Sequence, residues 1–231
     1  MRLRRLHPEP GVVGVEQAVR GLGLAALAPP DRPYLVVNMV ASVDGRATLE
    51  GSSRALSSPA DRELFLGLRT QVDAVLVGTQ TLRQERYPRL VRRPERRAVR
   101  VAEGLAPDPL AVVLTRSGDL PKDIGLFTDP AQEVVVLREA PGDALRRLRA
   151  ERGVRSVLCE GGPTLNAALL RDGVVDELFL TLSPVLAGGD EPLTVVAGPL
   201  GPAGPVALEL VRVLEGEGAM FLRYRVSRQH G

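Results

Sequence analysis

Cysteine, histidine and lysine are scarce in this chain of 231 residues, which has one cysteine, two histidines and a single lysine, Lys122. With Cys159 alone, the chain can form neither a disulfide framework nor a zinc site built from several cysteines. A lone cysteine also fits a reducing compartment, so we expect a cytoplasmic protein. His7 and His230 lie near the two ends with no partner that suggests a metal, and we expect no metal site.

Long apolar runs are missing too. No uncharged stretch reaches the roughly 18 residues that a transmembrane helix requires, so we expect no membrane span. The basic start at residues 1–6 resembles the beginning of a signal peptide, but His7, Pro8, Glu9 and Pro10 interrupt any apolar run there. We therefore expect no secretion signal.

Aromatic residues make up 3% of the chain, and the positive charge is almost wholly arginine, with a formal net charge of +2. A general preference for arginine codons explains this bias. Arginine also binds phosphate through two hydrogen bonds, so arginines near a glycine turn are candidates for ligand contacts. Eight arginines fall in a segment that we interpret as a loop: Arg83, Arg86, Arg89, Arg92, Arg93, Arg96, Arg97 and Arg100. Tyr87 is the one aromatic residue there that could stack on a base, so a solvated loop is favoured over a nucleic-acid surface.

One stretch organises the rest of the chain. The apolar run Ser156–Cys159 ends at the carboxylate Glu160, and Gly161, Gly162 and Pro163 follow before a helix-forming segment. This order predicts a strand, a tight turn and a helix with proline in its first turn. The free N–H groups and the positive dipole end of such a helix attract a phosphate, and glycines allow it to approach closely. An ordinary strand-to-helix connection would use the same residues.

A second segment of the same design lies upstream. The apolar strand of residues 72–77 leads into Gly78 and then into hydroxyl and amide side chains, including Thr81, that can cap a helix and hold phosphate oxygens. Two such corners suggest a dinucleotide bound across a sheet edge. The spacing matches neither the Rossmann fingerprint nor a P-loop, since no lysine follows the glycines.

The remaining pattern predicts one α/β domain over residues 1–231, because no linker or composition break divides it. Residues 33–43 form a nearly continuous apolar run, typical of a strand buried on both faces of a parallel or mixed sheet. Helical and strand patterns alternate along the core, residues 33–226, and residues 206–214 and 220–226 form a terminal hairpin. We expect a three-layer fold with a mostly parallel mixed sheet and an antiparallel C-terminal hairpin.

Two further expectations concern packing at the ends of the chain. Residues 1–32 form an N-terminal arm, in which apolar positions at helical spacing over residues 11–27 predict a helix that ends before Pro29. The strands of the terminal hairpin are long and apolar, and an uncovered edge of that kind favours pairing with another copy. We therefore expect a homodimer.

Two carboxylates at strand ends are the candidates for chemistry. Asp44 follows the strand of residues 33–43 and precedes Gly45, and α/β enzymes bind their ligands at such strand ends, although Asp-Gly is also an ordinary turn pair. Glu160 ends a buried strand beside two glycines, where a carboxylate is costly unless a polar group meets it. Cys159 is interpreted as a small core residue on that strand.

Five segments share their residues, order and spacing with a known family: Ser42–Arg46, Leu56–Ala60, Leu68–Arg69, Val75–Gly78 with Thr81, and Glu160–Leu165. Together they resemble the reductase domain of bacterial riboflavin biosynthesis, which shares the dihydrofolate reductase fold. The resemblance covers roughly residues 33–226, and the combination is far more specific than any one motif.

The resemblance implies an NADPH-dependent reduction of 5-amino-6-(5-phosphoribosylamino)uracil, in which hydride reaches C1 of the opened ribose and gives the ribitylamino product. It also implies a homodimer. On the cofactor side, where residues matching Gly162–Ala168 hold the pyrophosphate, it implies contacts from Val40, Gly78, Thr81, Glu85, Arg116, Ser117, Gly161, Gly162, Pro163, Thr164 and Leu165. On the substrate side it implies contacts from Ser53, Arg69, Leu90, Arg92 and Glu160. We expect NADPH rather than NADH, because Arg116 and Ser117 follow a strand end where a 2′-phosphate could sit without acidic repulsion.

Reduction of an imine or enamine carbon needs a proton at the neighbouring nitrogen, supplied by a carboxylic acid or by water that it orders. We expect Asp44 to lie nearer the reacting carbon and to assist proton delivery, while Glu160 mainly orients the substrate. Arg69 and Arg92 are expected to anchor the substrate phosphate.

Two residues depart from the family pattern. Members often carry a lysine where this chain has Asn38 and a tryptophan where it has Ala55, which bears on substrate identity. Bifunctional members also carry a zinc deaminase with a Pro-Cys-x-x-Cys motif, and with one cysteine we expect that activity to be absent. Two alternatives stay open: a dihydrofolate or pteridine reductase, and a non-catalytic protein that binds phosphorylated ligands or RNA on the same fold.

Overall fold

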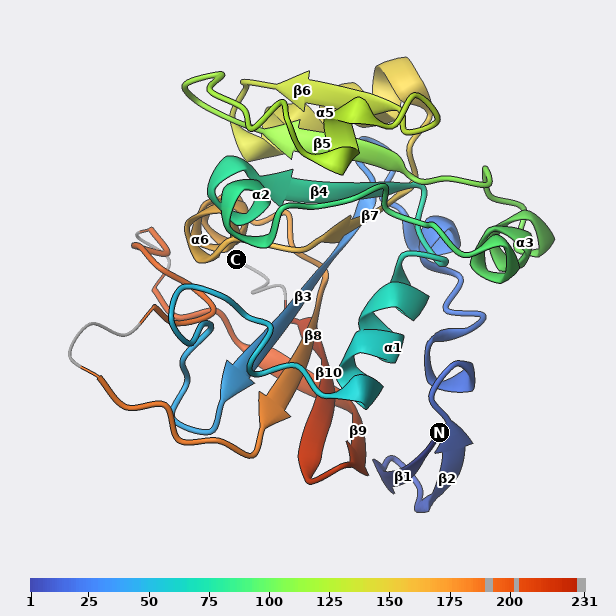
Figure 1. Cartoon of the computed structure of the whole chain (residues 1–231), viewed down its shortest axis with the longest axis vertical. Coiled ribbons are helices and arrows are strands. Elements are labelled where there is room, and N and C mark those ends of the chain that lie inside the picture. Colours follow the sequence, from blue (N-terminus) through green and yellow to red (C-terminus); the bar gives the residue numbers. More distant parts are fainter. Residues whose placement is uncertain (190–192, 202–203, 228–231) are drawn as a thin grey trace.

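The computed structural model describes residues 1–189, 193–201 and 204–227, and within these residues ten strands form one sheet (Figure 1). Their order across the sheet is β2-β1-β9-β10-β8-β3-β7-β4-β5-β6. The strands are β1 (Arg2–His7), β2 (Gly11–Gly14), β3 (Tyr34–Ser42), β4 (Ala74–Gly78), β5 (Leu110–Leu114), β6 (Val134–Leu137), β7 (Ser156–Cys159), β8 (Glu177–Ser183), β9 (Leu208–Gly216) and β10 (Ala219–Val226).

Helices follow most of the parallel strands. Ser58 caps α1, because its hydroxyl accepts a hydrogen bond from the backbone N–H of Asp61 at 3.2 Å. The helices are α1 (Pro59–Leu68), α2 (Thr79–Glu85), α3 (Pro94–Ala102), α4 (Gly125–Thr128), α5 (Pro141–Arg152) and α6 (Pro163–Arg171), with short 3-10 helices η1 (Gln17–Val19) and η2 (Leu24–Leu27).

The middle of the sheet is parallel, and an antiparallel part adjoins it, as predicted. β3 pairs in parallel with both β7 and β8, whereas β10 is antiparallel to its neighbours β8 and β9. The first residues of β3, Tyr34–Val37, are all buried, which agrees with the continuous apolar run in the sequence. The expected mostly parallel mixed sheet is therefore confirmed.

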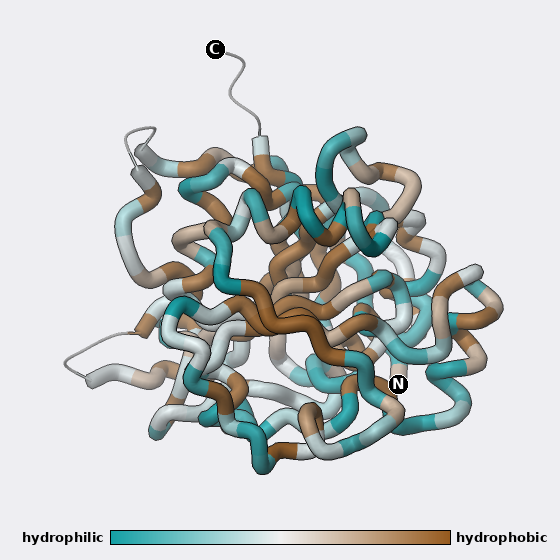
Figure 2. The backbone as a smooth tube through the Cα atoms, turned by 90° about the horizontal axis from the view of Figure 1, so that it is seen from above, coloured by the Kyte–Doolittle hydropathy of each residue, from teal (hydrophilic) through white to brown (hydrophobic). Residues whose placement is uncertain are grey.

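Helices cover both faces of the sheet and give three layers. Leu68 of α1 and Val36 of β3 belong to one buried apolar cluster, and Leu148 of α5 and Leu35 of β3 belong to another. Because Leu35 and Val36 are successive strand residues, they point to opposite faces. Figure 2 shows the resulting hydrophobic interior, with hydrophilic segments around it.

The predicted helix over residues 11–27 is wrong. Strand β2 and the two short 3-10 helices occupy this segment, and β1 and β2 extend the same sheet by pairing with β9 and with each other. Gly21 and Gly23 have φ values of +63° and +62°, which interrupt a regular helix. Apolar spacing alone did not reveal these breaks.

The arginine-rich segment is only in part a loop: Arg83, Arg96, Arg97 and Arg100 lie in helices, while Arg86, Arg89, Arg92 and Arg93 lie between them. Helix α2 ends at Arg86, which has a left-handed φ of +46°, and α3 begins at Pro94. Proline suits the first turn of a helix because its missing N–H would have no partner there. Several of these arginines pair with carboxylates, including Arg83 with Asp119, so their charge is less available to nucleic acid than a solvated loop would make it.

The expectation that the terminal hairpin presents an open edge is also wrong. β9 pairs with β1 and β10 pairs with β8, so both strands lie inside the sheet. The edges are β2 and β6. The backbone groups of the hairpin are therefore already paired, and edge pairing gives no support for a dimer.

The topology gathers several strand ends. Because β3, β7 and β4 are adjacent and parallel, their carboxyl ends lie at one edge of the sheet. Ser42, Cys159 and Gly78 are the last residues of these strands, so the segments that follow them share one region.

Candidate active site

The two glycine corners predicted from the sequence meet at this edge. The backbone N–H of Gly78 donates to the carbonyl of Gly161 at 2.8 Å. A Cβ atom at Gly162 would lie 2.9 Å from the hydroxyl oxygen of Thr81, and one at Gly78 would lie 3.5 Å from the backbone nitrogen of Gly162. Gly161 has a φ of +84°, and the Gly161–Gly162 peptide bond is cis. Side chains at these positions would fill the space where the two corners touch.

Helix α6 starts in this corner. Gly162 is its N-cap, and no side chain caps the first turn, while Pro163 lies at the helix start as predicted. The exposed Thr164 and the half-buried Leu165 follow. The first N–H groups of this nine-residue helix are therefore available to an anion, which the helix dipole also favours.

Glu160 and Arg69 form a buried ion pair beside the corner. Nε and Nη2 of Arg69 donate to the two carboxylate oxygens of Glu160, each at 2.7 Å, and Nη1 donates to the carbonyl of Leu90 at 2.9 Å. The side chains are 5% and 1% exposed. The guanidinium lies 4.4 Å from the ring centre of Phe65 and 5.3 Å from that of Tyr87. This arrangement provides the polar partner that a buried Glu160 requires.

Burial and this pairing shift two pKa values. Burial acts to lower the pKa of Arg69, but the attraction and hydrogen bonds of Glu160 outweigh it, so the pKa is raised. The pKa of Tyr87 is raised well above its ordinary value by burial and then by the negative charge of Glu160. The cluster therefore keeps a charged arginine and a neutral phenol.

Asp44 holds a neighbouring loop. Its carboxylate accepts hydrogen bonds from the Ser42 hydroxyl at 2.5 Å and from the backbone N–H groups of Ala187 and Gly188 at 3.0 and 2.8 Å. These bonds, the one from Ala187 first, hold the pKa of Asp44 far below its ordinary value. The carboxylate is exposed and ionised at neutral pH, so proton delivery through Asp44 would have to use water that it orders.

Ser53, predicted on the substrate side, and Glu85, predicted on the cofactor side, are joined by hydrogen bonds. Glu85 accepts hydrogen bonds from the backbone N–H and the hydroxyl of Ser53, at 2.9 and 3.0 Å. It also accepts from the hydroxyl of Ser52 at 3.1 Å and from Nε of Arg54 at 3.1 Å. The predicted substrate loop is thus attached to the end of α2, which follows the Gly78 corner.

The other predicted residues are more dispersed. Val40 is half-buried on β3, Leu90 is buried and offers its carbonyl to Arg69, and Arg92 is exposed without a hydrogen bond or ion pair to any described residue. Arg116 and Ser117 are exposed after β5 and contact none of the other predicted site residues through a hydrogen bond in the described structure.

An open hollow of about 490 Å³ begins at Gly118, the residue after Ser117, and neither Arg116 nor Ser117 lines it. It is lined by Gly118, Leu120, Lys122, Val136, Arg138, Glu139 and Arg147. Asp119 lies near this region, contrary to the expectation of no acidic residue, but its carboxylate is paired with Arg83 at 2.5 Å. Glu139 is similarly paired with Arg147. Positive charge therefore prevails around the hollow.

Sequence reasoning missed the groups that support these residues. Phe65 and Tyr87 flank Arg69, and the loop at Ala187 and Gly188 holds Asp44, yet none of the four was predicted to support a site residue. Two aromatic residues near arginines in a chain so poor in aromatics were the available signal for the first pair. The partners of Asp44 are backbone groups and leave no mark in the sequence.

The two positions that depart from the family differ in exposure. Asn38 is half-buried and lines a small cavity with Arg212 and Arg223, whereas Ala55 is exposed. In the described residues, no group of three or more His, Cys, Asp or Glu side chains is placed to bind a metal, and no helix has the length and apolarity to cross a membrane. His230 lies outside the described residues.

Comparison with known proteins agrees with the fold and the motifs. Residues 33–220 match the family model of the RibD C-terminal domain. The 2,5-diamino-6-ribosylamino-4(3H)-pyrimidinone 5′-phosphate reductase of Archaeoglobus fulgidus is 31% identical over 192 residues, which cover 72% of this chain and 87% of that protein. The riboflavin biosynthesis protein RibD of Mycobacterium tuberculosis is 36% identical over 167 residues, 71% of this chain but 45% of that longer protein.

Solved structures share the fold. A pyrimidine reductase-like protein from Corynebacterium diphtheriae superposes with a TM-score of 0.73 at 24% identity, covering 94% of this chain and all of that one. RibD of Acinetobacter baumannii has a TM-score of 0.70 at 22% identity, and the match covers 59% of its length. With the family model matched over most of the chain, this protein belongs to the RibD C-terminal domain family, the reductases of riboflavin biosynthesis.

Proposed function

We propose that this chain uses NADPH to reduce 5-amino-6-(5-phosphoribosylamino)uracil at C1 of its opened ribose, giving the ribitylamino product. The observation that carries the proposal is the meeting of the Gly78 corner, the Gly161–Gly162 corner and the buried Glu160 at one sheet edge. A helix start suited to an anion and a buried carboxylate are thereby next to each other, which supports binding of cofactor and substrate at this edge.

The residues present fit the cofactor. A Cβ on Gly162 would obstruct the corner, and the uncapped first turn of α6 has N–H groups for a pyrophosphate. When bound, the nicotinamide supplies the hydride. Gly161, Gly162 and Thr164 would hold the diphosphate, while Thr81 closes the opposite side of the cradle.

Charge favours NADPH over NADH. Arg116 follows β5, two residues before Gly118, which lines a hollow together with Lys122 and Arg138. A 2′-phosphate gains from unpaired cations, and the nearby carboxylate of Asp119 is already neutralised by Arg83.

On the substrate side, the structure has the buried Arg69–Glu160 pair and the exposed guanidinium of Arg92. Glu160 is held in one orientation by Arg69, which takes one acceptor position of each carboxylate oxygen, and we propose that the remaining acceptor positions meet the substrate. Arg92 has no described partner and is the better candidate for the phosphate, because all three side-chain nitrogens of Arg69 already donate within the protein. Asp44 is proposed to order the water that supplies the proton.

A second substrate is favoured by the relatives. The Archaeoglobus protein is named for a 2,5-diamino-pyrimidinone phosphate, which carries an amino group where the uracil carries an oxygen. The same cradle and phosphate contact would serve both compounds. Only the groups facing the pyrimidine ring would distinguish them.

Activity assays can decide between these substrates. NADPH oxidation is followed with the uracil phosphate, the diamino-pyrimidinone phosphate and dihydrofolate in parallel. We expect turnover of the uracil phosphate with the highest kcat/KM and none of dihydrofolate. Preference for the diamino compound would reassign the substrate, and preference for dihydrofolate, or RNA binding without NADPH oxidation, would contradict the proposal.

We also propose a cytoplasmic homodimer. Leu208 and Leu210 are exposed on β9, beside the half-buried Leu180 and Leu222 on the same sheet face. Burying such a face against a second copy would remove apolar surface from water. A monomer mass by light scattering at working concentration would contradict the dimer, and recovery of the protein outside the cytoplasmic fraction of its cells would contradict the location.

A further inference from the structure

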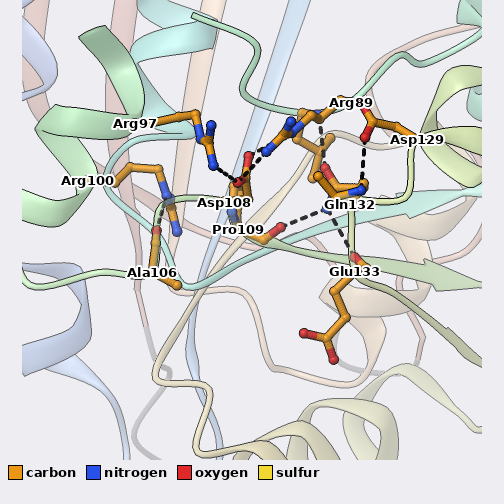
Figure 3. A network of polar contacts seen from close by, with 11 residues as sticks. Arg89, Arg97, Arg100, Ala106, Asp108, Pro109, Asp129, Gln132 and Glu133 are labelled. Carbon is orange, nitrogen blue, oxygen red and sulfur yellow. Dashed lines mark hydrogen bonds and ion pairs between the residues drawn. The ribbon is translucent and has the colours of Figure 1, made fainter. Parts of the chain in front are cut away.

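We infer that a cluster behind the site, comprising Arg89, Arg97, Arg100, Asp108 and Gln132 and called here the rear cluster, positions Arg69 and through it Glu160 (Figure 3). None of these five side chains was predicted to contact the substrate or cofactor. The inference rests on the proposed function, because Glu160 and Arg69 matter there as substrate-side residues. Each step of the connection is a hydrogen bond or ion pair in the structure.

The first step runs through Leu90. Its carbonyl accepts from Nη1 of Arg69 at 2.9 Å, and its own N–H donates to the amide oxygen of Gln132 at 3.0 Å. The amide nitrogen of Gln132 in turn donates to the carbonyls of Pro109 and Glu133, both at 3.0 Å. Gln132 is buried, so its amide is held in one orientation. The position of the Leu90 carbonyl, and hence the third contact of Arg69, depends on this amide.

The second step acts on the backbone of Arg69. Arg100 of α3 is fully buried and donates to the carbonyls of Arg69, Val72 and Ala106 at 2.5, 2.7 and 2.7 Å. No carboxylate forms an ion pair with Arg100 in the described structure, and burial lowers its pKa to about 10. A buried cation without a counter-ion is expensive. Its contacts hold the chain where α1 ends and β4 approaches, so they set where the Arg69 side chain begins.

The third step joins the segment before Leu90 to α3. Nε and Nη2 of Arg89 donate to the two carboxylate oxygens of Asp108 at 3.0 and 2.7 Å, and Nη2 of Arg97 lies 3.0 Å from the same carboxylate. The side chains of Arg89 and Asp108 are 17% and 14% exposed, so this pair is shielded from most of the solvent, while Arg97 is more exposed at 39%. Asp108 therefore links the Leu90 segment to the helix that carries Arg100.

The contacts of the rear cluster affect the orientation of Arg69 and Glu160 more than the charge at the site. Loosening Leu90 removes one of three restraints on the Arg69 guanidinium and leaves Glu160 with a partner that can rotate. Because Glu160 orients the substrate, the expected consequence is weaker substrate binding with the chemical step unchanged. The NADPH cradle belongs to another part of the sheet edge and should be unaffected.

The kinetic test uses two variants and one control. Asp108→Asn removes the charge of the link, and Gln132→Leu removes the amide. Each should raise KM for the pyrimidine phosphate about fivefold, with kcat and the KM for NADPH within about twofold of the unmodified chain. Asp143→Asn is the control, because Asp143 pairs with Arg146 on α5 and makes no hydrogen bond or ion pair with the rear cluster. Its substrate KM should not change even where stability falls.

A second measurement is independent of turnover. In ¹H–¹⁵N spectra of arginine side chains, the Nε–H of Arg69, assigned by its loss in Arg69→Lys, should exchange slowly with solvent. Asp108→Asn and Gln132→Leu should accelerate this exchange about tenfold, and Asp143→Asn should not. Unchanged exchange in a folded Asp108→Asn chain would overturn the inference, as would an equal rise of substrate KM in the control. Absence of turnover in the unmodified chain would refute the proposed function, and the exchange rates would still decide the role of the rear cluster.

Discussion

Arg69 and Glu160, 91 residues apart in the sequence, are joined by two hydrogen bonds of 2.7 Å between almost fully buried side chains. Arg69 ends helix α1, and Glu160 follows strand β7. The pair therefore connects the helix that covers one face of the sheet to the turn that precedes α6. In the proposed function, substrate orientation and local stability depend on the same contact.

Breaking this pair should destabilise the fold. Glu160→Gln leaves a buried guanidinium without its counter-charge and should lower the free energy of unfolding by about 3 kcal/mol. Urea denaturation measures the change. The exposed pair of Arg225 and Glu209 is the control, and Arg225→Ala should change stability by less than about 0.5 kcal/mol. Equal effects of the two substitutions would show that the buried pair contributes no more than a surface one.

Removing the charge of Asp44 should slow the chemical step. Asp44→Asn should lower kcat by about tenfold to a hundredfold with KM little changed, because the carboxylate is proposed to order the proton-bearing water. Steady-state kinetics over a range of pH provide the measurement. Full turnover of Asp44→Asn at every pH, together with an inactive Glu160→Gln, would reverse the two roles.

Asp44 should also contribute to acid sensitivity. Its pKa is depressed in the folded chain below the ordinary value of 3.8, so its stabilising contribution is fully present above that value and is lost as the pH falls through the folded pKa. The difference in Tm between the unmodified chain and Asp44→Asn should therefore be largest near neutrality and shrink at about pH 2. Asp143→Asn, at an exposed carboxylate paired with Arg146, serves as the control. A difference that grows toward low pH would contradict the assignment.

A methyl group at the cradle should weaken cofactor binding. Gly162→Ala places a Cβ 2.9 Å from the Thr81 hydroxyl and should raise the Kd for NADPH by about tenfold or more, measured by cofactor fluorescence. Gly142→Ala, where a Cβ meets its nearest atom at an ordinary 3.5 Å, should leave binding unchanged. Unaltered affinity in Gly162→Ala would place the diphosphate elsewhere.

The choice between cofactors should depend on Arg116. NADPH should bind more tightly than NADH, and Arg116→Ala should reduce that preference by about fivefold to tenfold through loss of a charge-assisted contact. Arg20→Ala, at an exposed arginine of the N-terminal segment, is the comparison. Equal affinities for the two cofactors, both before and after Arg116→Ala, would remove the basis for this assignment.

The sequence predicted what depends on local pattern. The run Tyr34–Val37 and the turn at Gly161–Gly162 have strong periodic or conformational signatures, so the central strand and the α6 start were found. The 11–27 segment was misread because apolar spacing outweighed its glycines. No local pattern could show that Arg69 faces Glu160, because that contact depends on how α1 packs over the sheet.

Contacts through the backbone were equally hidden. Asp44 lies where it was expected, at a strand end, but its partners are the N–H groups of Ala187 and Gly188, which any residue type would supply. The same holds for the Leu90 carbonyl that meets Arg69. The sequence can therefore identify a carboxylate as a candidate site residue. Its pKa and the orientations open to its side chain depend on groups that the tertiary fold brings next to it.

The proposed function requires hydride transfer from NADPH to the sugar carbon, and deuterium labelling of the cofactor detects this transfer. The chain is incubated with 5-amino-6-(5-phosphoribosylamino)uracil and NADPH deuterated on the transferring face of the nicotinamide C4, with each face labelled in turn. If the hydride comes from one face of the nicotinamide, the ribitylamino product should carry one deuterium at C1 with one of the two labelled cofactors and none with the other. A product without deuterium from either cofactor, or no product while NADPH remains unoxidised, would contradict the proposed function.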